Sequence, residues 1–298
     1  MKGAASVKDR LKNRSKESGK TLQELLVAYG LERAIYRLSV SRYKENFILK
    51  GGIFLYAFFG GDFTRATTDI DFLAQKISND AEDMKAVFTD IFSLEADDPL
   101  RFDLKTLEAK AITEFKKYHG VNISIAAFLD RTRIPVSIDI GFGDVIYPDK
   151  AELDFPVILS DECPRIYAYS LYSSVAEKFE AIVSLAYDNS RFKDFYDLYI
   201  LAVNYDFDGN DLKEAVKETF ENRHTSFTEI AAFETGFSED PLRQSRWKSF
   251  VKKKRAMIPV TLEETISVIR RLMEPIAASI TTDKLTDKIW NHKQQIWK

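Results

Sequence analysis

The spacing of apolar residues changes along the chain, and each change predicts a different kind of structure. From residue 6 to about residue 45, apolar side chains recur close to the helical period, as in TLQELLVAYGLERAIYRLSVS, which predicts amphipathic helices. The next stretch, ENFILKGGIFLYAFFG, predicts a buried turn that leads into a helix, and TTDIDFLAQ predicts a strand. Residues 80–93 combine acidic and apolar residues in the pattern of another helix.

Strand patterns dominate from about residue 101 to residue 140. In IPVSIDIGFGD, aliphatic residues occupy one face and Asp139 the other. Beyond Pro156 the patterns become helical, through SSVAEKFEAIVSLAYDNSRFKDFYDLYILA, DLKEAVKETFENR and TLEETISVIRRLMEPIA. Thr261 and Glu264 have capping-box spacing at the start of the last helix. The predicted fold class is α+β: an α/β half with a mixed, mostly antiparallel sheet over residues 1–160, then a mainly helical half over residues 161–298.

Composition narrows the classes of function. The 298-residue chain has a formal net charge of −3, so contact with nucleic acid would need a local basic patch. Cys163 is the only cysteine, which excludes an intrachain disulfide. The first 20 residues lack the apolar core of a signal peptide, and runs such as FLYAFFGG are shorter than the roughly 20 residues of a membrane span. We therefore expect a cytoplasmic protein without membrane contact.

Two carboxylates separated by one apolar residue follow a glycine-rich segment, in LKGGIFLYAFFGGDFTRATTDIDFLAQ. On a strand, Asp69 and Asp71 point to the same side while Ile70 points to the core. Carboxylates so close repel each other unless a cation lies between them. Asp139, on a second predicted strand, supplies a third oxygen ligand, so the set predicts a metal site for Mg²⁺ or Mn²⁺. The alternative is a solvated strand edge or turn.

The helical half holds a second group of charged residues among apolar ones. Lys178 is flanked by core-type residues in AEKFEAIV, and Asp194 lies in the aromatic-rich segment SRFKDFYDLYIL. Charges in such a segment lie near buried surface and need partners. The simpler alternatives are a lysine whose ammonium reaches water and a surface ladder of ion pairs. No Walker loop, nucleophile elbow or zinc-type Cys/His spacing occurs.

Taken together, these segments resemble a known family. The chain contains, in order, Lys50-Gly51-Gly52, Arg65-x-Thr67-x-Asp69-Ile70-Asp71, Ala176-Glu177-Lys178 and Arg191-x-Lys193-Asp194-x-x-Asp197-Leu198. This ordered set is similar to the motifs of the AbiEii/AbiGii toxin family, a branch of the DNA polymerase β-type nucleotidyltransferases. The D-x-D triplet alone is a weak signal, whereas the ordered set is specific.

The resemblance implies a polymerase β-type core that transfers a nucleoside monophosphate from an NTP to an acceptor hydroxyl and releases pyrophosphate. It implies that Asp69 and Asp71 hold the metal ion, with Asp139 completing the site. It also implies that Lys178 faces the triphosphate, and that Asp194 holds either Lys178 or a second cation. The active site is expected in a cleft that the helical half completes. The implied nucleotide-binding residues are Lys50, Gly51, Gly52, Arg65, Thr67, Arg191 and Lys193.

The resemblance also implies partners. Several family members add nucleotides to the 3′ end of tRNA and thereby block translation. An antitoxin encoded by the neighbouring gene, often with an AbiEi-like winged-helix domain, normally accompanies them. Two basic runs, at residues 8–20 and 248–255, are candidates for RNA contact, although such runs are more often solvated faces.

One position departs from the family pattern. Ile53 stands where a serine or threonine usually follows the glycine pair, so the backbone N–H groups of Gly51 and Gly52, or Thr67, must replace that hydroxyl. Two other functions stay open from the sequence. The enzyme could modify a protein or small-molecule hydroxyl, or the fold could be a catalytically degenerate nucleotide-binding module, for which Ile53 is the only hint.

Overall fold

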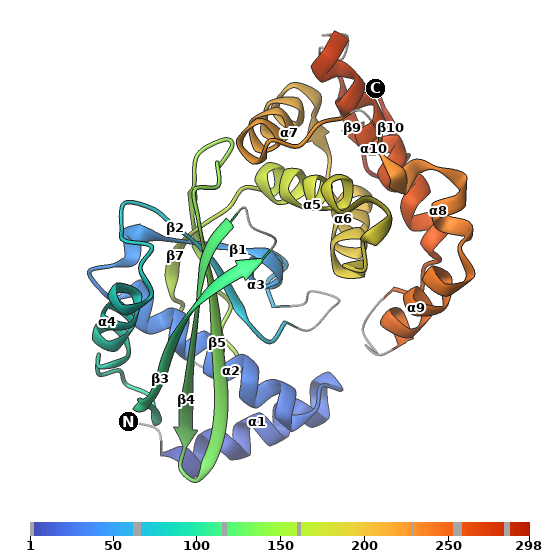
Figure 1. Ribbon diagram of the computed structural model, residues 1–298. Helices are drawn as coiled ribbons and strands as arrows, with labels where there is room; N and C mark the ends of the chain where they lie inside the picture. The colour runs from blue at the N-terminus through green and yellow to red at the C-terminus, as the bar shows by residue number, and fades with distance from the viewer. Residues whose placement is uncertain are drawn as a thin grey trace. The chain divides into compact units, whose positions relative to one another are not determined.

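The chain folds into two compact units (Figure 1). The computed structural model describes residues 3–61, 67–114, 118–159, 162–227, 229–252, 258–282 and 287–298. The sheet unit comprises Met1–Gly143 and Ala151–Tyr169, and the helical unit comprises Asp144–Lys150 and Ser170–Lys298. The division after Tyr169 lies slightly beyond the boundary expected near residue 160, because a strand at Arg165–Ala168 still pairs within the sheet.

The sheet unit is built on a seven-stranded mixed sheet with the order β3-β4-β5-β2-β1-β7-β6. Two neighbouring pairs, β1–β7 and β2–β5, are parallel, and the others are antiparallel. The sheet is therefore mixed and mostly antiparallel, as predicted. Its strands are β1 (Phe47–Lys50), β2 (Ile70–Ala74), β3 (Leu100–Glu114), β4 (Tyr118–Leu129), β5 (Thr132–Phe142), β6 (Ala151–Asp154) and β7 (Arg165–Ala168).

In the described residues, the α-helices of the sheet unit are α1 (Ala4–Ser18), α2 (Leu22–Ser39), α3 (Gly51–Phe58) and α4 (Ala81–Phe92). Helix α2 packs against β5, α4 packs against β3 and β4, and α3 packs against β1 and β2. Along β5, the aliphatic residues from Ile134 to Ile140 are buried, whereas Ser137 and Asp139 on the other face are half-buried. The core therefore holds one face of β5 in place and leaves the opposite face for polar groups.

The prediction for residues 47–50 was wrong, because these residues form strand β1 and not a turn. Phe47, Ile48 and Leu49 are all fully buried, so this central strand shows no alternation of apolar and polar residues. A short continuous apolar run does not distinguish a buried strand from the entry to a helix.

The helical unit contains the six remaining α-helices of the described chain and a small three-stranded sheet of order β10-β9-β8. The predicted capping box begins its last helix: Thr261 N donates to Glu264 Oε2 at 3.0 Å, and Glu264 N donates to Thr261 Oγ1 at 3.1 Å. Among the described helices, none is long and apolar enough to cross a membrane. The elements are α5 (Leu171–Leu185), α6 (Phe192–Asn204), β8 (Phe207–Asp208), α7 (Gly209–Arg223), α8 (Thr235–Glu239), α9 (Pro241–Lys252), α10 (Leu262–Thr282), β9 (Ile289–Asn291) and β10 (Ile296–Trp297).

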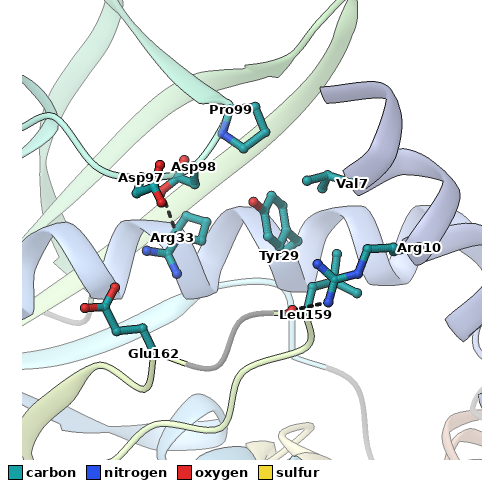
Figure 2. Close-up of a pocket in the computed structure, with 9 residues that line it drawn as sticks. All are labelled: Val7, Arg10, Tyr29, Arg33, Asp97, Asp98, Pro99, Leu159 and Glu162. Atoms are coloured by element: carbon teal, nitrogen blue, oxygen red, sulfur yellow. Dashed lines mark hydrogen bonds and ion pairs between the residues drawn. The ribbon is translucent and has the colours of Figure 1, made fainter. Parts of the chain in front are cut away.

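A buried ion cluster fastens α2 to the segment that precedes β3. Arg33 Nε donates to Asp98 Oδ2 at 2.9 Å, and Arg37 donates to both carboxylate oxygens at 3.1 and 3.3 Å. The three side chains are 5–6% exposed. Beside them lies a small cavity of about 100 Å³, lined also by Tyr29 and Arg10 (Figure 2). Because its charged groups Arg33 and Asp98 already pair with each other, we assign this region a structural role.

Substituting Asp98 should destabilise the protein strongly. Asp98→Ala removes the only carboxylate that the described structure pairs with Arg37 and leaves Arg33 with Glu32 alone, at 3.4 Å. Losing one partner of a buried pair costs about 3–5 kcal/mol in the free energy of unfolding. Urea denaturation followed by circular dichroism measures the loss. The matched control is Asp90→Ala, which removes the exposed partner of Arg42 and should leave the denaturation midpoint nearly unchanged. Equal midpoints for the two variants would contradict the assignment.

Candidate functional site

Four neighbouring strands place a row of polar residues side by side. Lys50 on β1 pairs with Asp71 on β2, and Asp71 pairs in parallel register with Asp139 on β5. Asp139 in turn pairs with Asn122 on β4. Residues paired in register point to the same face of a sheet. The row therefore carries two adjacent carboxylates, with an amide on one side and a lysine on the other.

The three aspartates that the sequence singled out lie together. One carboxylate oxygen from each of Asp69, Asp71 and Asp139 lies within 4.8 Å of the others, and all three residues are half-buried. Mg²⁺ binds oxygen ligands at about 2.1 Å, so opposite ligands in its shell are about 4.2 Å apart. Small side-chain rotations bring the three oxygens into one such shell. The donor set therefore fits Mg²⁺ or Mn²⁺.

Asp69 lies one residue before β2 and is held by its own loop. Its carboxylate accepts hydrogen bonds from Thr67 Oγ1 at 3.2 Å and from Thr68 N at 3.3 Å. The Thr67 hydroxyl, which the sequence proposes for nucleotide binding, thus contacts Asp69 in this structure, and its nucleotide-binding role stays a prediction. Arg65, the other predicted residue of this loop, lies outside the described residues.

Asn122 orients the third carboxylate. Its Nδ2 donates to Asp139 Oδ1 at 2.6 Å and to Ser137 Oγ at 3.0 Å. The sequence analysis missed Asn122, because only the β4–β5 register brings it beside Asp139. A polar residue on the exposed face of a strand was the only signal, and such residues are common.

Gly51 allows the backbone to pass directly over the carboxylate row. It has a φ of +67°, and a Cβ at this position would lie 2.0 Å from Asp71 Oδ2. Gly51 also begins α3, whose first N–H groups have no acceptor within the helix. Ile53, where the family usually has a hydroxyl residue, is 2% exposed and belongs to the core. Lys50 Nζ lies 5.4 Å from the centre of the Tyr169 ring.

In the helical unit, Lys178 is held by two buried aspartates. Its Nζ lies 2.6 Å from Asp197 Oδ2 and 3.6 Å from Asp194 Oδ1. Arg191 Nε binds the other oxygen of Asp194 at 2.8 Å. Lys178 is 8% exposed and Asp197 is completely buried, so the alternative in which the ammonium extends into water was wrong. Lys193 is exposed.

Asp197 is the second residue whose role the sequence missed. The sequence assigned Asp194 as the partner of Lys178, and the structure places Asp197 closer. Asp197 appeared in the motif, three residues after Asp194, but residue spacing alone did not show which aspartate meets a lysine on another helix.

Arg223, at the end of α7, forms ion pairs with three carboxylates, which the sequence analysis did not predict. It binds Asp144 at 2.9 Å, Glu177 at 3.0 Å and Glu180 at 2.7 Å. Burial alone would lower the pKa of Arg223, but the carboxylates outweigh it and raise the pKa above its ordinary value. The cluster ties residues 144–150 to the helical unit, which explains why this segment leaves the sheet unit.

Metal affinity should depend on Asn122. In Asn122→Ala the Asp139 carboxylate loses the bond that orients it, and loss of such an outer partner typically weakens metal binding by about 10- to 100-fold. Titration with Mn²⁺, followed by the electron paramagnetic resonance signal of the free ion, measures the affinity. Ser137→Ala is the matched control, because it removes the other acceptor of Asn122 and keeps the bond to Asp139. Wild-type affinity in Asn122→Ala would rule out this role.

Comparisons with single known proteins give remote likenesses. Among proteins with curated functions, none matches this sequence. Two solved structures from Helicobacter pylori resemble the fold. The protein JHP933 shares 17% identity, with 87% of this chain and 94% of that chain covered and a TM-score of 0.48. A candidate nucleotidyltransferase shares 18% identity, with 86% and 95% covered and a TM-score of 0.48. Likeness at this level is too remote to bear on function.

The family comparison is more informative. The profile of the nucleotidyl transferase AbiEii toxin family, of type IV toxin–antitoxin systems, matches residues 33–266. This range contains β1 to β7 and the helices that hold Lys178, Asp194 and Asp197. The chain therefore belongs to the AbiEii nucleotidyltransferase toxin family.

Proposed function

We propose that this protein is a toxin that transfers a nucleoside monophosphate from an NTP to an RNA acceptor, at the 3′ end of tRNA, and thereby blocks translation. The main support is the cluster of Asp69, Asp71 and Asp139, whose oxygens lie within 4.8 Å of one another. Family membership supports the reaction class. The choice of tRNA as acceptor extends what the family resemblance implies.

The carboxylates would hold Mg²⁺ or Mn²⁺, and the ion, when bound, neutralises charge on the phosphates and on the leaving pyrophosphate. Asn122 keeps Asp139 in position for this role. We assign Asp139 a further task, in which its carboxylate orients the acceptor hydroxyl and accepts its proton. The acceptor oxygen then attacks the α-phosphorus, and the bond to the pyrophosphate oxygen breaks.

The start of α3 is the proposed triphosphate site. The N–H groups of Gly51 and Gly52 belong to the first turn of the helix, where free donors and the helix dipole favour phosphate oxygens. Gly51 has no Cβ between the backbone and Asp71, so phosphate and carboxylates can approach closely. Lys50 adds a positive charge on the same row. These donors replace the hydroxyl that Ile53 lacks.

Lys178 is the proposed charge from the helical unit. Asp197 and Asp194 keep its ammonium in one orientation, and a preorganised charge in a water-poor site stabilises a transition state more than a mobile one. Arg191 and Lys193 have secondary roles in binding the nucleotide.

The proposed partner is an antitoxin encoded by the neighbouring gene, AbiEi-like with a winged-helix domain. Membership of a type IV toxin–antitoxin family implies an antitoxin, and the winged-helix identity extends that inference. NTPs and tRNA are available in the cytoplasm, where we place the activity.

Isosteric changes in the carboxylate row should abolish transfer. Asp71→Asn or Asp139→Asn keeps the side-chain shape and removes a charged ligand, so the rate should fall by about 10²-fold or more. The assay incubates the protein with total tRNA and each α-³²P-labelled NTP in turn, and follows label on RNA. Asp154→Asn, an exposed aspartate on β6, is the control. Label on protein, or on neither, would reject the RNA acceptor.

The Lys178 test requires a paired variant. Lys178→Ala alone leaves Asp197 buried without its cation, which destabilises the fold. The double variant Lys178→Met/Asp197→Asn removes both charges together and should remain folded by circular dichroism. It should still lose about 10²-fold in transfer. Wild-type transfer by a folded double variant would exclude Lys178 from the reaction.

Expression of the wild-type protein should arrest cell growth, and this toxicity should require Asp71. An enzyme that disables tRNA arrests growth unless it is restrained, so wild-type protein should stop growth and co-expression of the neighbouring gene should restore it. Asp71→Asn, at a level matched by immunoblot, should permit growth. Unimpaired growth with the wild-type protein at that level would argue against the toxin.

A further inference from the structure

The structure distinguishes between the two basic runs of the sequence. On α1, Lys8 Nζ lies 3.5 Å from Asp130, Lys12 Nζ lies 3.5 Å from Asp9, and Arg14 lies 3.7 Å from Glu17. The Arg10 guanidinium donates to the carbonyl of Leu159. The positive charges of α1 are therefore largely compensated by groups of the same unit.

Helix α9 has a different charge pattern. Its sequence, PLRQSRWKSFVK, contains four cations and no acidic residue, in a chain whose net charge is −3. Arg243 donates to the carbonyls of Phe237 and Tyr187. Arg246, Lys248 and Lys252 are exposed, and no described residue forms an ion pair with any of them. Lys248 and Lys252 are i,i+4 neighbours, so they share one side of the exposed face. This face carries strong uncompensated positive charge.

Aromatic packing attaches α9 to the helix that carries Asp194 and Asp197. Trp247 is 1% exposed. Its ring packs edge-on against the ring of Phe192, with 5.8 Å between the ring centres. The ring centre of Phe250 lies 6.2 Å from the ring centre of Phe192 and 6.2 Å from that of Tyr196. Phe192 is the first residue of α6 and lies next to the exposed Lys193 in sequence. The cationic helix is thus packed on the first turns of α6, the helix that also carries Asp194 and Asp197.

We propose that the exposed face of α9, formed by Arg246, Lys248 and Lys252, binds the phosphate backbone of the acceptor RNA. We name this set the α9 surface. The proposal rests on the proposed function for the choice of RNA, and on the charge and packing of the helical unit for the location. A polyanion suits these groups because each phosphate contact releases a counterion, and free lysines and arginines provide such contacts.

The aromatic anchor has a clear physical consequence. Since Trp247 and Phe250 hold α9 by buried contacts, charge reversal on its exposed face changes the surface and leaves the core unaltered. Trp247 Nε1 also donates to the carbonyl of Val260 at 2.8 Å, which fixes the indole. The α9 surface is therefore a rigid charged platform and can be tested by surface substitutions alone.

The test compares two charge-reversal pairs. Fluorescence anisotropy with fluorescein-labelled total tRNA, without NTP, gives the Kd from 50 to 300 mM salt. Lys248→Glu/Lys252→Glu should weaken binding by about tenfold or more and lower the salt slope by about two, since each lysine–phosphate contact contributes about one. Lys12→Glu/Arg14→Glu on α1 is the matched control and should change the Kd by less than about twofold. Circular dichroism and Mn²⁺ titration should be unchanged in both variants.

The measurements of tRNA binding and of NMP transfer test the two proposals separately. Suppose that the wild-type protein transfers NMP to RNA and that Lys248→Glu/Lys252→Glu binds tRNA as tightly as wild type. Then α9 does not bind the RNA, and the proposed function is unaffected. If the wild-type protein binds tRNA through α9 but transfers no NMP, RNA binding by α9 is supported and the proposed function is rejected. If the α9 pair keeps tRNA binding and instead loses binding to the purified antitoxin, the surface docks a protein and the proposal is overturned.

Discussion

The repulsion between Asp71 and Asp139 is the constraint on which the rest of the site depends. The parallel register of β2 and β5 places these carboxylates side by side, and two like charges so close are unfavourable without compensation. Asn122 compensates Asp139 by donating to its carboxylate at 2.6 Å, and Lys50, in register with Asp71, places a cationic residue on the same face of the sheet. A shift of β5 by one residue would turn Asp139 toward the core. The apolar face of β5 therefore protects the site by fixing its register.

In the helical unit, charged side chains are buried and paired with one another. Asp197 is completely buried and Lys178 is 8% exposed, so neither is hydrated and each needs the other. Arg223 likewise gathers Asp144, Glu177 and Glu180. Buried ion pairs contribute less to stability than apolar residues of the same size, but they hold charged groups in one orientation. Such fixed charge suits the role that we propose for Lys178.

The two basic helices show that composition alone does not reveal which charges have partners. Helix α1 is rich in lysine and arginine, yet its charges meet aspartate, glutamate and carbonyl groups of the same unit. Helix α9 keeps its lysines exposed because its aromatic residues, Trp247 above all, occupy the packed face. Surface charge attracts a polyanion only when no neighbouring group already compensates it.

The sequence by itself determined the α+β class, the mixed and mostly antiparallel sheet, most of the helices and the three aspartates, because periodicity shows which face each side chain occupies. It did not determine strand β1, since three consecutive buried residues carry no period. The partnerships of Asn122 with Asp139, and of Asp197 with Lys178, were decided only by the tertiary structure. Strand register and helix packing join residues that are distant in the sequence, and periodicity within one element contains no information about its neighbour.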